Sequence, residues 1–220
     1  MSSAITQASL VPLFAQAGKE STIEQFLLSG LSLAKNEPAT IQWFAAKVRD
    51  PAASTPEYII FDTFPDEEGR KAHFAGDIPK ALHAHGAEFL ARPPDVSQVA
   101  CEILVGKVVK VDGAAEGDVK MGYQGGLRVL MEAKPGKREA LKEFLKGAEA
   151  MLEGEPGTLV WYAVHFTGTD KFAVVDFFAT EEGRQAHLKG KIAAALFASV
   201  EENMVGPPEI KPIDVIGAKV

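Results

Sequence analysis

Apolar positions along the chain follow one order of patterns twice. In each half, an apolar segment of strand length precedes a stretch with helical spacing, which predicts a helix with one buried stripe. The two stripes are Ile23, Phe26, Leu27, Leu33 and Ala34 in the first half and Leu141, Phe144, Leu145, Met151 and Leu152 in the second. Aromatic and β-branched runs on either side of turns at 49–56 and 167–170 then predict a hairpin in each half.

A second helix and a last strand complete each half. Asp66 and Thr180 are the predicted N-caps of the second helices, and an acidic first turn follows each of them. These helices end near the proline pairs at 93–94 and 207–208, and a final apolar segment follows each pair. The order β-α-β-β-α-β predicts an α+β unit of the ferredoxin-like type, an antiparallel sheet with two helices on one face.

The repetition extends to individual residues. Trp43 recurs 118 positions later as Trp161, and from Asp62 onward the offset becomes 114, so that Asp62 matches Asp176 and His73 matches His187. The chain is therefore predicted to be an internal duplication. Its first unit is expected at 8–109, a glycine-rich linker at 110–125 and its second unit at 126–220.

The predicted hairpin strands are apolar at nearly every position, whereas a strand with one face in water alternates apolar and polar residues. Both faces of each sheet are therefore expected to be covered. Helices cover one face, and the sister unit is the simplest cover for the other. We predict an intramolecular pseudo-dimer, and association into a homodimer stays open.

Composition and charge argue against several classes of partner, location and metal site. A net charge of −7 and a pI near 5.3 argue against binding to nucleic acid or to an anionic membrane, because both require a basic surface. No apolar run approaches the length of a membrane span, and the N-terminal segment lacks the pattern of a signal peptide. Cys101 is the only cysteine, and no cluster has the spacing of a metal site. These features predict a cytoplasmic protein without a metal.

The segment from Asp176 to Leu188, repeated at 62–74, resembles the strand-to-helix signature of the antibiotic biosynthesis monooxygenase (ABM) superfamily. The resemblance covers both halves and implies two ferredoxin-like units packed as a dimeric α/β barrel. It also implies a cofactor-independent monooxygenase that oxidises a hydrophobic aromatic, phenolic or quinol molecule with O2. Such a reaction needs an apolar pocket, a base and hydrogen-bond donors.

The second half supplies candidates for these roles. Trp161, His165 and Asp176 are the candidate catalytic residues, since the first two share parity on one strand and the third lies on its hairpin partner. The candidate substrate-binding residues are Tyr162, His187, Phe178, Trp43, His73 and Asp62. Only this half has a histidine and a tyrosine beside its tryptophan, because Lys47 matches His165 in the first half.

Structural roles compete with each assignment. The two tryptophans are better explained by core packing, and the helix-start histidines by hydrogen bonds with a neighbouring strand. The strand aspartates are expected to bond backbone amides or to pair with Arg70 and Arg184 rather than act as bases.

Two further hypotheses remain open. Haem binding has support only from His83 and His85 in the first half, and both are better explained as solvated helix residues. A non-catalytic protein that binds a small ligand, or a stress-related interaction module, is the rival from another class. An open cavity at the candidate residues favours catalysis, and a filled core favours the rival.

Overall fold

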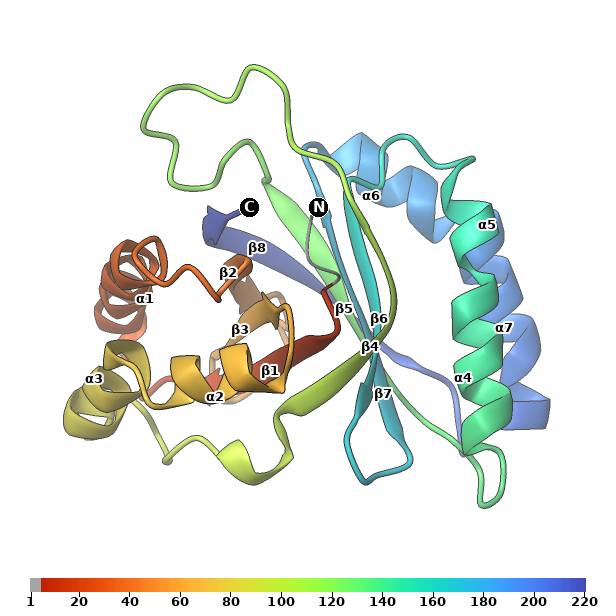
Figure 1. The fold of residues 1–220 in the computed structure, drawn as a ribbon, viewed down its shortest axis with the longest axis horizontal. Coiled ribbons are helices and arrows are strands. Elements are labelled where there is room, and N and C mark those ends of the chain that lie inside the picture. Colours follow the sequence, from red (N-terminus) through yellow and green to blue (C-terminus); the bar gives the residue numbers. More distant parts are fainter. Residues whose placement is uncertain (1–4) are drawn as a thin grey trace. The chain divides into compact units, whose positions relative to one another are not determined.

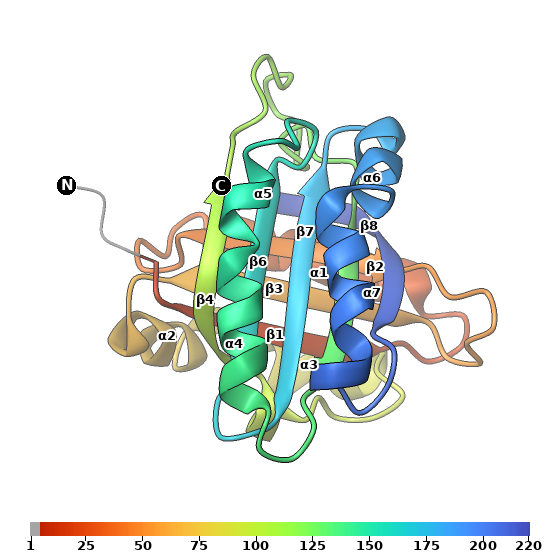
Figure 2. The same cartoon turned by 90° about the vertical axis from the view of Figure 1, so that its right-hand side faces the viewer.

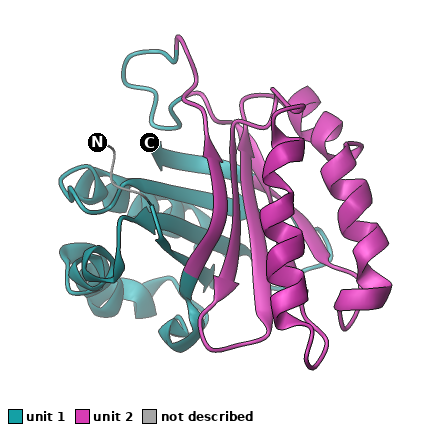
Figure 3. Cartoon of the chain, turned by 45° about the vertical axis from the view of Figure 1, so that its right-hand side comes forward, with its two compact units in different colours: residues 1–101, 114–121, 214–220 teal, residues 102–113, 122–213 magenta. Residues whose placement is uncertain are grey.

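The computed structural model describes residues 5–220. Residues 1–4, part of the N-terminal segment that argued against a signal peptide, lie outside the described residues. The chain divides into two compact units (Figure 3). Unit 1 consists of Met1–Cys101, Ala114–Met121 and Asp214–Val220, and unit 2 consists of Glu102–Gly113 and Gly122–Ile213.

Each unit follows the predicted order of elements (Figure 1). Unit 1 contains β1 (Gln7–Phe14), α1 (Glu20–Ala34), β2 (Gln42–Val48), β3 (Glu57–Phe64), α2 (Glu67–Phe74), α3 (Asp77–His85) and the short 3-10 turns η1 (Gly86–Glu88) and η2 (Val96–Gln98). Unit 2 contains β5 (Gly125–Glu132), α4 (Arg138–Gly147), α5 (Glu149–Leu152), β6 (Val160–Phe166), β7 (Lys171–Phe178), α6 (Glu181–Leu188) and α7 (Lys191–Asn203).

The last strand of each repeat, β4 (Ala100–Val108) or β8 (Glu209–Lys219), is divided between the units. The eight strands follow the order β1-β3-β2-β8-β5-β7-β6-β4 in a closed barrel. The predicted fold class is confirmed: the chain is a tandem of two ferredoxin-like units with the dimeric α/β-barrel topology.

The predicted N-caps are confirmed. The Asp66 carboxylate accepts a hydrogen bond from the Gly69 amide at 2.8 Å, and the Thr180 hydroxyl accepts one from the Gly183 amide at 3.2 Å. Each predicted second helix is in fact two helices, because the chain breaks just before α3 and before α7. The residue at each break is a glycine, Gly76 or Gly190, in an extended conformation.

Strand β5 begins at Gly125, the last residue of the expected linker. Gly125 and Gly126 belong to the strand and pair with Phe178 and Phe177 of β7. A side chain at Gly126 would drive its Cβ into the carbonyl oxygen of Asp176. A glycine is therefore required there by close strand approach and not by flexibility.

The hairpin register places each tryptophan beside an aspartate. Trp43 of β2 pairs with Asp62 of β3, and Trp161 of β6 pairs with Asp176 of β7. Residues directly opposite each other in an antiparallel pair project to the same face. In unit 2 this is the face over which α4 and α7 lie (Figure 2), and the tryptophan packs into the core between the strands and those helices.

Candidate functional site

A buried carboxylate and an imidazole meet in unit 1, between β3 and α2. Nε2 of His73 lies 3.2 Å from Oδ2 of Asp62, and Nδ1 of the same ring lies 2.6 Å from Oε2 of Glu37. The Thr40 hydroxyl donates to that Glu37 oxygen at 2.6 Å, and the Ser9 hydroxyl donates to Oδ1 of Asp62. A chain of polar groups thus runs from the fully buried Asp62 to Glu37, whose side chain is 22% exposed.

Unit 2 repeats this cluster at matching positions. Nε2 of His187 lies 3.4 Å from Oδ2 of Asp176, and Nδ1 lies 2.5 Å from Oε2 of Glu155. The Thr158 hydroxyl donates to Glu155 at 3.1 Å, and the backbone amide of Leu127 donates to Oδ1 of Asp176 at 2.8 Å. The histidine bridging two carboxylates is therefore a feature of the repeat.

Burial changes the acidity of both aspartates. Loss of solvation raises the pKa of Asp62 to about 6 and that of Asp176 to about 7, against the opposing effect of the neighbouring imidazole. Within the described residues, Oδ2 of each aspartate makes no hydrogen bond of acceptable geometry, although it lies within ion-pair distance of the histidine. This oxygen can accept a proton at near-neutral pH.

The two clusters differ in what lies next to them. In unit 1, Asp62 and His73 line a cavity of about 570 Å³ whose other walls come mainly from apolar residues of β1, β3, α3 and the segment after it. Those walls include Val11, Ile60, Ile78, Leu82 and Leu90. This volume is in the range of sites for small organic ligands.

The matching space in unit 2 is filled. It measures about 30 Å³ and is lined by Ile192 and Leu196, which correspond to Ile78 and Leu82, and also by Trp161. Helix α7 continues to Asn203, and Leu196 is buried, whereas α3 ends at His85 and Leu82 is only partly buried. The longer helix therefore keeps its apolar side chains against the sheet and closes the space.

Unit 2 has a different hollow on the other side of its cluster. About 470 Å³ is lined by Glu155, Thr158 and His187, together with Gly157 and Gly190. This hollow reaches the Glu155 end of the cluster, where Nδ1 of the imidazole is engaged. It therefore offers no equivalent of the aspartate-lined cavity of unit 1.

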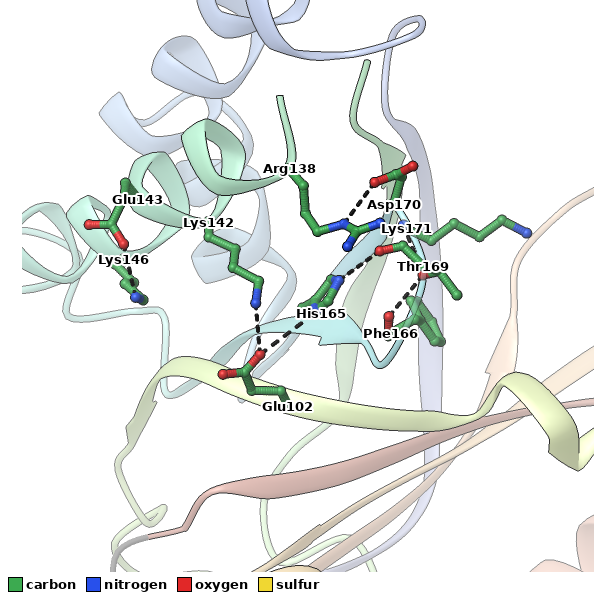
Figure 4. A network of polar contacts seen from close by, with 10 residues as sticks. All are labelled: Glu102, Arg138, Lys142, Glu143, Lys146, His165, Phe166, Thr169, Asp170 and Lys171. Atoms are coloured by element: carbon green, nitrogen blue, oxygen red, sulfur yellow. Dashed lines mark hydrogen bonds and ion pairs between the residues drawn. The ribbon is translucent and has the colours of Figure 1, made fainter. Parts of the chain in front are cut away.

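His165 lies in a network of polar contacts with Glu102 and Thr169 (Figure 4). It pairs with Phe172 near the turn of the β6–β7 hairpin, and its Nε2 lies 2.8 Å from the carbonyl oxygen of Thr169. Its Nδ1 lies 3.5 Å from Glu102, which also accepts a hydrogen bond from Lys142 at 3.0 Å. The structure brings Trp161 and Asp176 together but places His165 in a separate polar network.

The aromatic candidates are buried. Trp43 and Trp161 are at most 1% exposed and belong to the cores of their units. Phe178 packs on the His187 ring with ring centroids 5.6 Å apart. The Tyr162 ring lies so close to Gly106 that a Cβ added there would overlap it. These contacts account for the aromatics through packing.

The arginine pairing expected for the aspartates is replaced by the histidine contacts. Arg70 forms its ion pair with Glu67 at 2.6 Å, and Arg184 forms one with Glu181 at 2.5 Å, each within one helix. The other two histidines lie on α3: His83 contributes to the cavity wall, and His85 contacts Glu88 at the surface.

The sequence analysis did not identify the glutamate and the threonine of each cluster. Glu37 and Thr40 recur 118 positions later as Glu155 and Thr158, in the short patterns Glu-Pro-Ala-Thr and Glu-Pro-Gly-Thr. The proline that recurs within these patterns marks the repeat in the sequence. The contact of each glutamate with a histidine could not be predicted, because it joins the segment before β2 or β6 to a helix far along the chain.

His165→Ala should leave ligand binding in the unit 1 cavity unchanged, because no contact of His165 reaches the residues that line it. The substitution should still lower the free energy of unfolding by about 1–3 kcal/mol, since it removes a buried hydrogen bond and a ring packed 4.8 Å from Phe172. Urea denaturation beside a ligand titration measures both quantities. A tenfold loss of binding in a folded variant would contradict this placement.

In the described part of the chain, no group of three or more histidine, cysteine, aspartate or glutamate side chains could hold a metal ion. None of its helices is long and apolar enough to cross a membrane.

Known proteins resemble this chain mainly in structure. No family model matches the sequence, and no curated protein matches it. Among solved structures, a protein of Fusobacterium nucleatum named "Putative monooxygenase" matches 98% of this chain and 94% of its own with a TM-score of 0.80 and 14% identity. An anthrone oxidase-like protein matches 97% of this chain and 92% of its own with a TM-score of 0.57 and 12% identity.

A protein of unknown function from Nitrosomonas europaea is 44% identical over 44% of this chain and 94% of its own, with a TM-score of 0.43. The two full-length likenesses agree with the resemblance of the repeated strand-to-helix segment. The chain shares the fold of these two structures, and it forms that fold as a tandem duplicate within one polypeptide.

Proposed function

We propose that this protein is a cofactor-independent monooxygenase that oxidises a hydrophobic phenol, quinol or anthrone with O2 in the cavity of unit 1. The single observation that carries the proposal is the pairing of an open apolar cavity of about 570 Å³ with a buried aspartate at its wall. The monooxygenase and anthrone oxidase-like names of the similar structures support the reaction class.

The residues present can perform the first step. The phenolic or enolic O–H bond of the substrate breaks as its proton moves to Oδ2 of Asp62, and the electron pair stays on the substrate oxygen. The His73 ring, held between Asp62 and Glu37, lies at the same wall and can donate an N–H hydrogen bond to the substrate anion. The polar chain to Glu37 gives the proton a route toward solvent.

The oxidation balances without another reductant. The substrate anion transfers one electron to O2, and the two radicals combine to form a C–O bond. Protonation gives a hydroperoxide, and loss of the second C–H proton as the O–O bond breaks leaves a carbonyl group and water. One substrate CH2 group and one O2 thus become one C=O group and one water molecule.

Oxygen uptake tests the proposal directly. Purified protein is incubated with a panel of anthrones and hydroquinones, in air and under nitrogen, while absorbance and dissolved oxygen are followed. We expect oxygen-dependent product with one O2 consumed per substrate. Tight binding of panel members without any oxygen consumption above the uncatalysed rate would instead favour the small-ligand-binding rival, which the same cavity also suits.

A further inference from the structure

The mouth of the unit 1 cavity carries a cation that unit 2 lacks. Arg92 lines the cavity, and the position that matches it in the second repeat is Gly206. Arg92 is exposed, and the rest of the cavity wall consists mainly of apolar side chains, in a chain of net charge −7. Arg92 therefore places a positive charge at the solvent side of an apolar cavity, where it can bind an acidic group of a ligand.

The Arg92 side chain has a defined position. Its guanidinium carbon lies 3.7 Å from the centroid of the Phe14 ring, a cation–π contact that leaves the N–H groups at the edge free to donate. The backbone is fixed as well, since the Ala91 amide donates to the carbonyl oxygen of Phe14 at 2.8 Å, and two prolines follow Arg92. Because the side chain is already held in place, binding an anion would cost it little conformational entropy.

No carboxylate of the described residues occupies this guanidinium. Arg92 forms no ion pair there, and the nearest acidic residue along the chain, Asp95, accepts hydrogen bonds from the amide and hydroxyl of Ser97 at 3.0 and 2.6 Å. The N–H groups of Arg92 are therefore available to a planar or tetrahedral oxyanion, which they can bind through two donors.

We propose that the cavity of unit 1 takes an amphipathic ligand, an aromatic body with an acidic group, and that Arg92 binds the acidic group at the mouth. The inference rests on the proposed function in taking this cavity as the substrate site. Asp62 at the buried wall repels an anion, so the acidic end can lie only at the mouth. The opposite end of the aromatic body then faces Asp62, and Arg92 sets the orientation.

Two fluorescent probes with the same ring skeleton test this assignment. Anilinonaphthalene sulfonate carries an acidic group, and N-phenylnaphthylamine lacks it. We expect wild-type protein to bind the sulfonate at least tenfold more tightly, with an affinity that falls as salt is added because the contact is electrostatic. Arg92→Met should remove that tenfold preference and leave binding of the neutral probe within about twofold, while Arg92→Lys should keep most of the preference.

A cavity-filling control locates the probes. Ala87→Trp adds a large side chain to an exposed position of the cavity wall and should abolish binding of both probes. Equal affinities in wild type, equal losses of both probes in Arg92→Met, or no binding of either probe would each overturn the proposal. Because the readout is binding, its failure is distinct from an absence of oxygenase turnover.

Discussion

Asp62→Asn should lower oxygen-dependent turnover at least about 100-fold, because an amide cannot accept the substrate proton and general bases typically contribute two to four orders of magnitude. Asparagine keeps the shape of the side chain and its hydrogen bond from Ser9, so the cavity should stay intact. Initial rates of oxygen uptake at pH 8, well above the pKa of about 6 raised by burial of Asp62, measure the effect. The wild-type kcat/KM should rise as pH increases through that value.

The duplication provides a matched control. Asp176→Asn makes the same change in the matching polar cluster, whose His187 lines a space of only about 30 Å³. Its turnover should stay within about threefold of wild type. The opposite result, in which Asp176→Asn abolishes turnover and Asp62→Asn does not, would return the active site to the second half, where the sequence pattern favoured it.

Local patterns in the sequence were sufficient for the fold. The 118- and 114-residue offsets revealed the duplication, and the N-caps Asp66 and Thr180 marked where helices begin, because capping depends on a few adjacent residues. The breaks at Gly76 and Gly190 were missed, since a helix with glycine at one position still shows a continuous apolar stripe.

The location of the cavity could not be predicted from these patterns. Some of the apolar residues that line the two spaces match, such as Ile78 and Leu82 of unit 1 with Ile192 and Leu196 of unit 2. The volumes differ because α3 ends before Gly86, whereas α7 continues through the equivalent Val200. A difference in helix length thus determines whether the same side chains leave a space.

Strand parity alone could not predict where His165 lies. Residues 161 and 165 do project to the same face of β6, as parity requires. They are nevertheless four residues apart along an extended strand, about 13 Å, so they cannot share one small site. Parity predicts a face, and only the surrounding helices determine which part of that face lies next to a cavity.

Asp176→Asn should become more stable relative to wild type as pH rises. The folded pKa of Asp176, raised to about 7 by burial, exceeds its unfolded value near 3.8. The protonated Asp176 carboxyl therefore makes its full contribution to the stability of the folded protein below about pH 4, and this contribution is lost as pH rises through 7. The substituted asparagine does not titrate, so the variant should gain about 2–3 kcal/mol on wild type between pH 5 and pH 8, at 1.36 kcal/mol per pKa unit.

Urea denaturation of both proteins at pH 5 and pH 8 measures this gain. Asp62, the other buried aspartate, is present in both proteins, so its own titration cancels in the difference. A stability difference that stays constant within about 0.5 kcal/mol would mean that Asp176 is ionised in the folded protein throughout this range. The imidazole and the Leu127 amide would then stabilise its charge more than burial destabilises it.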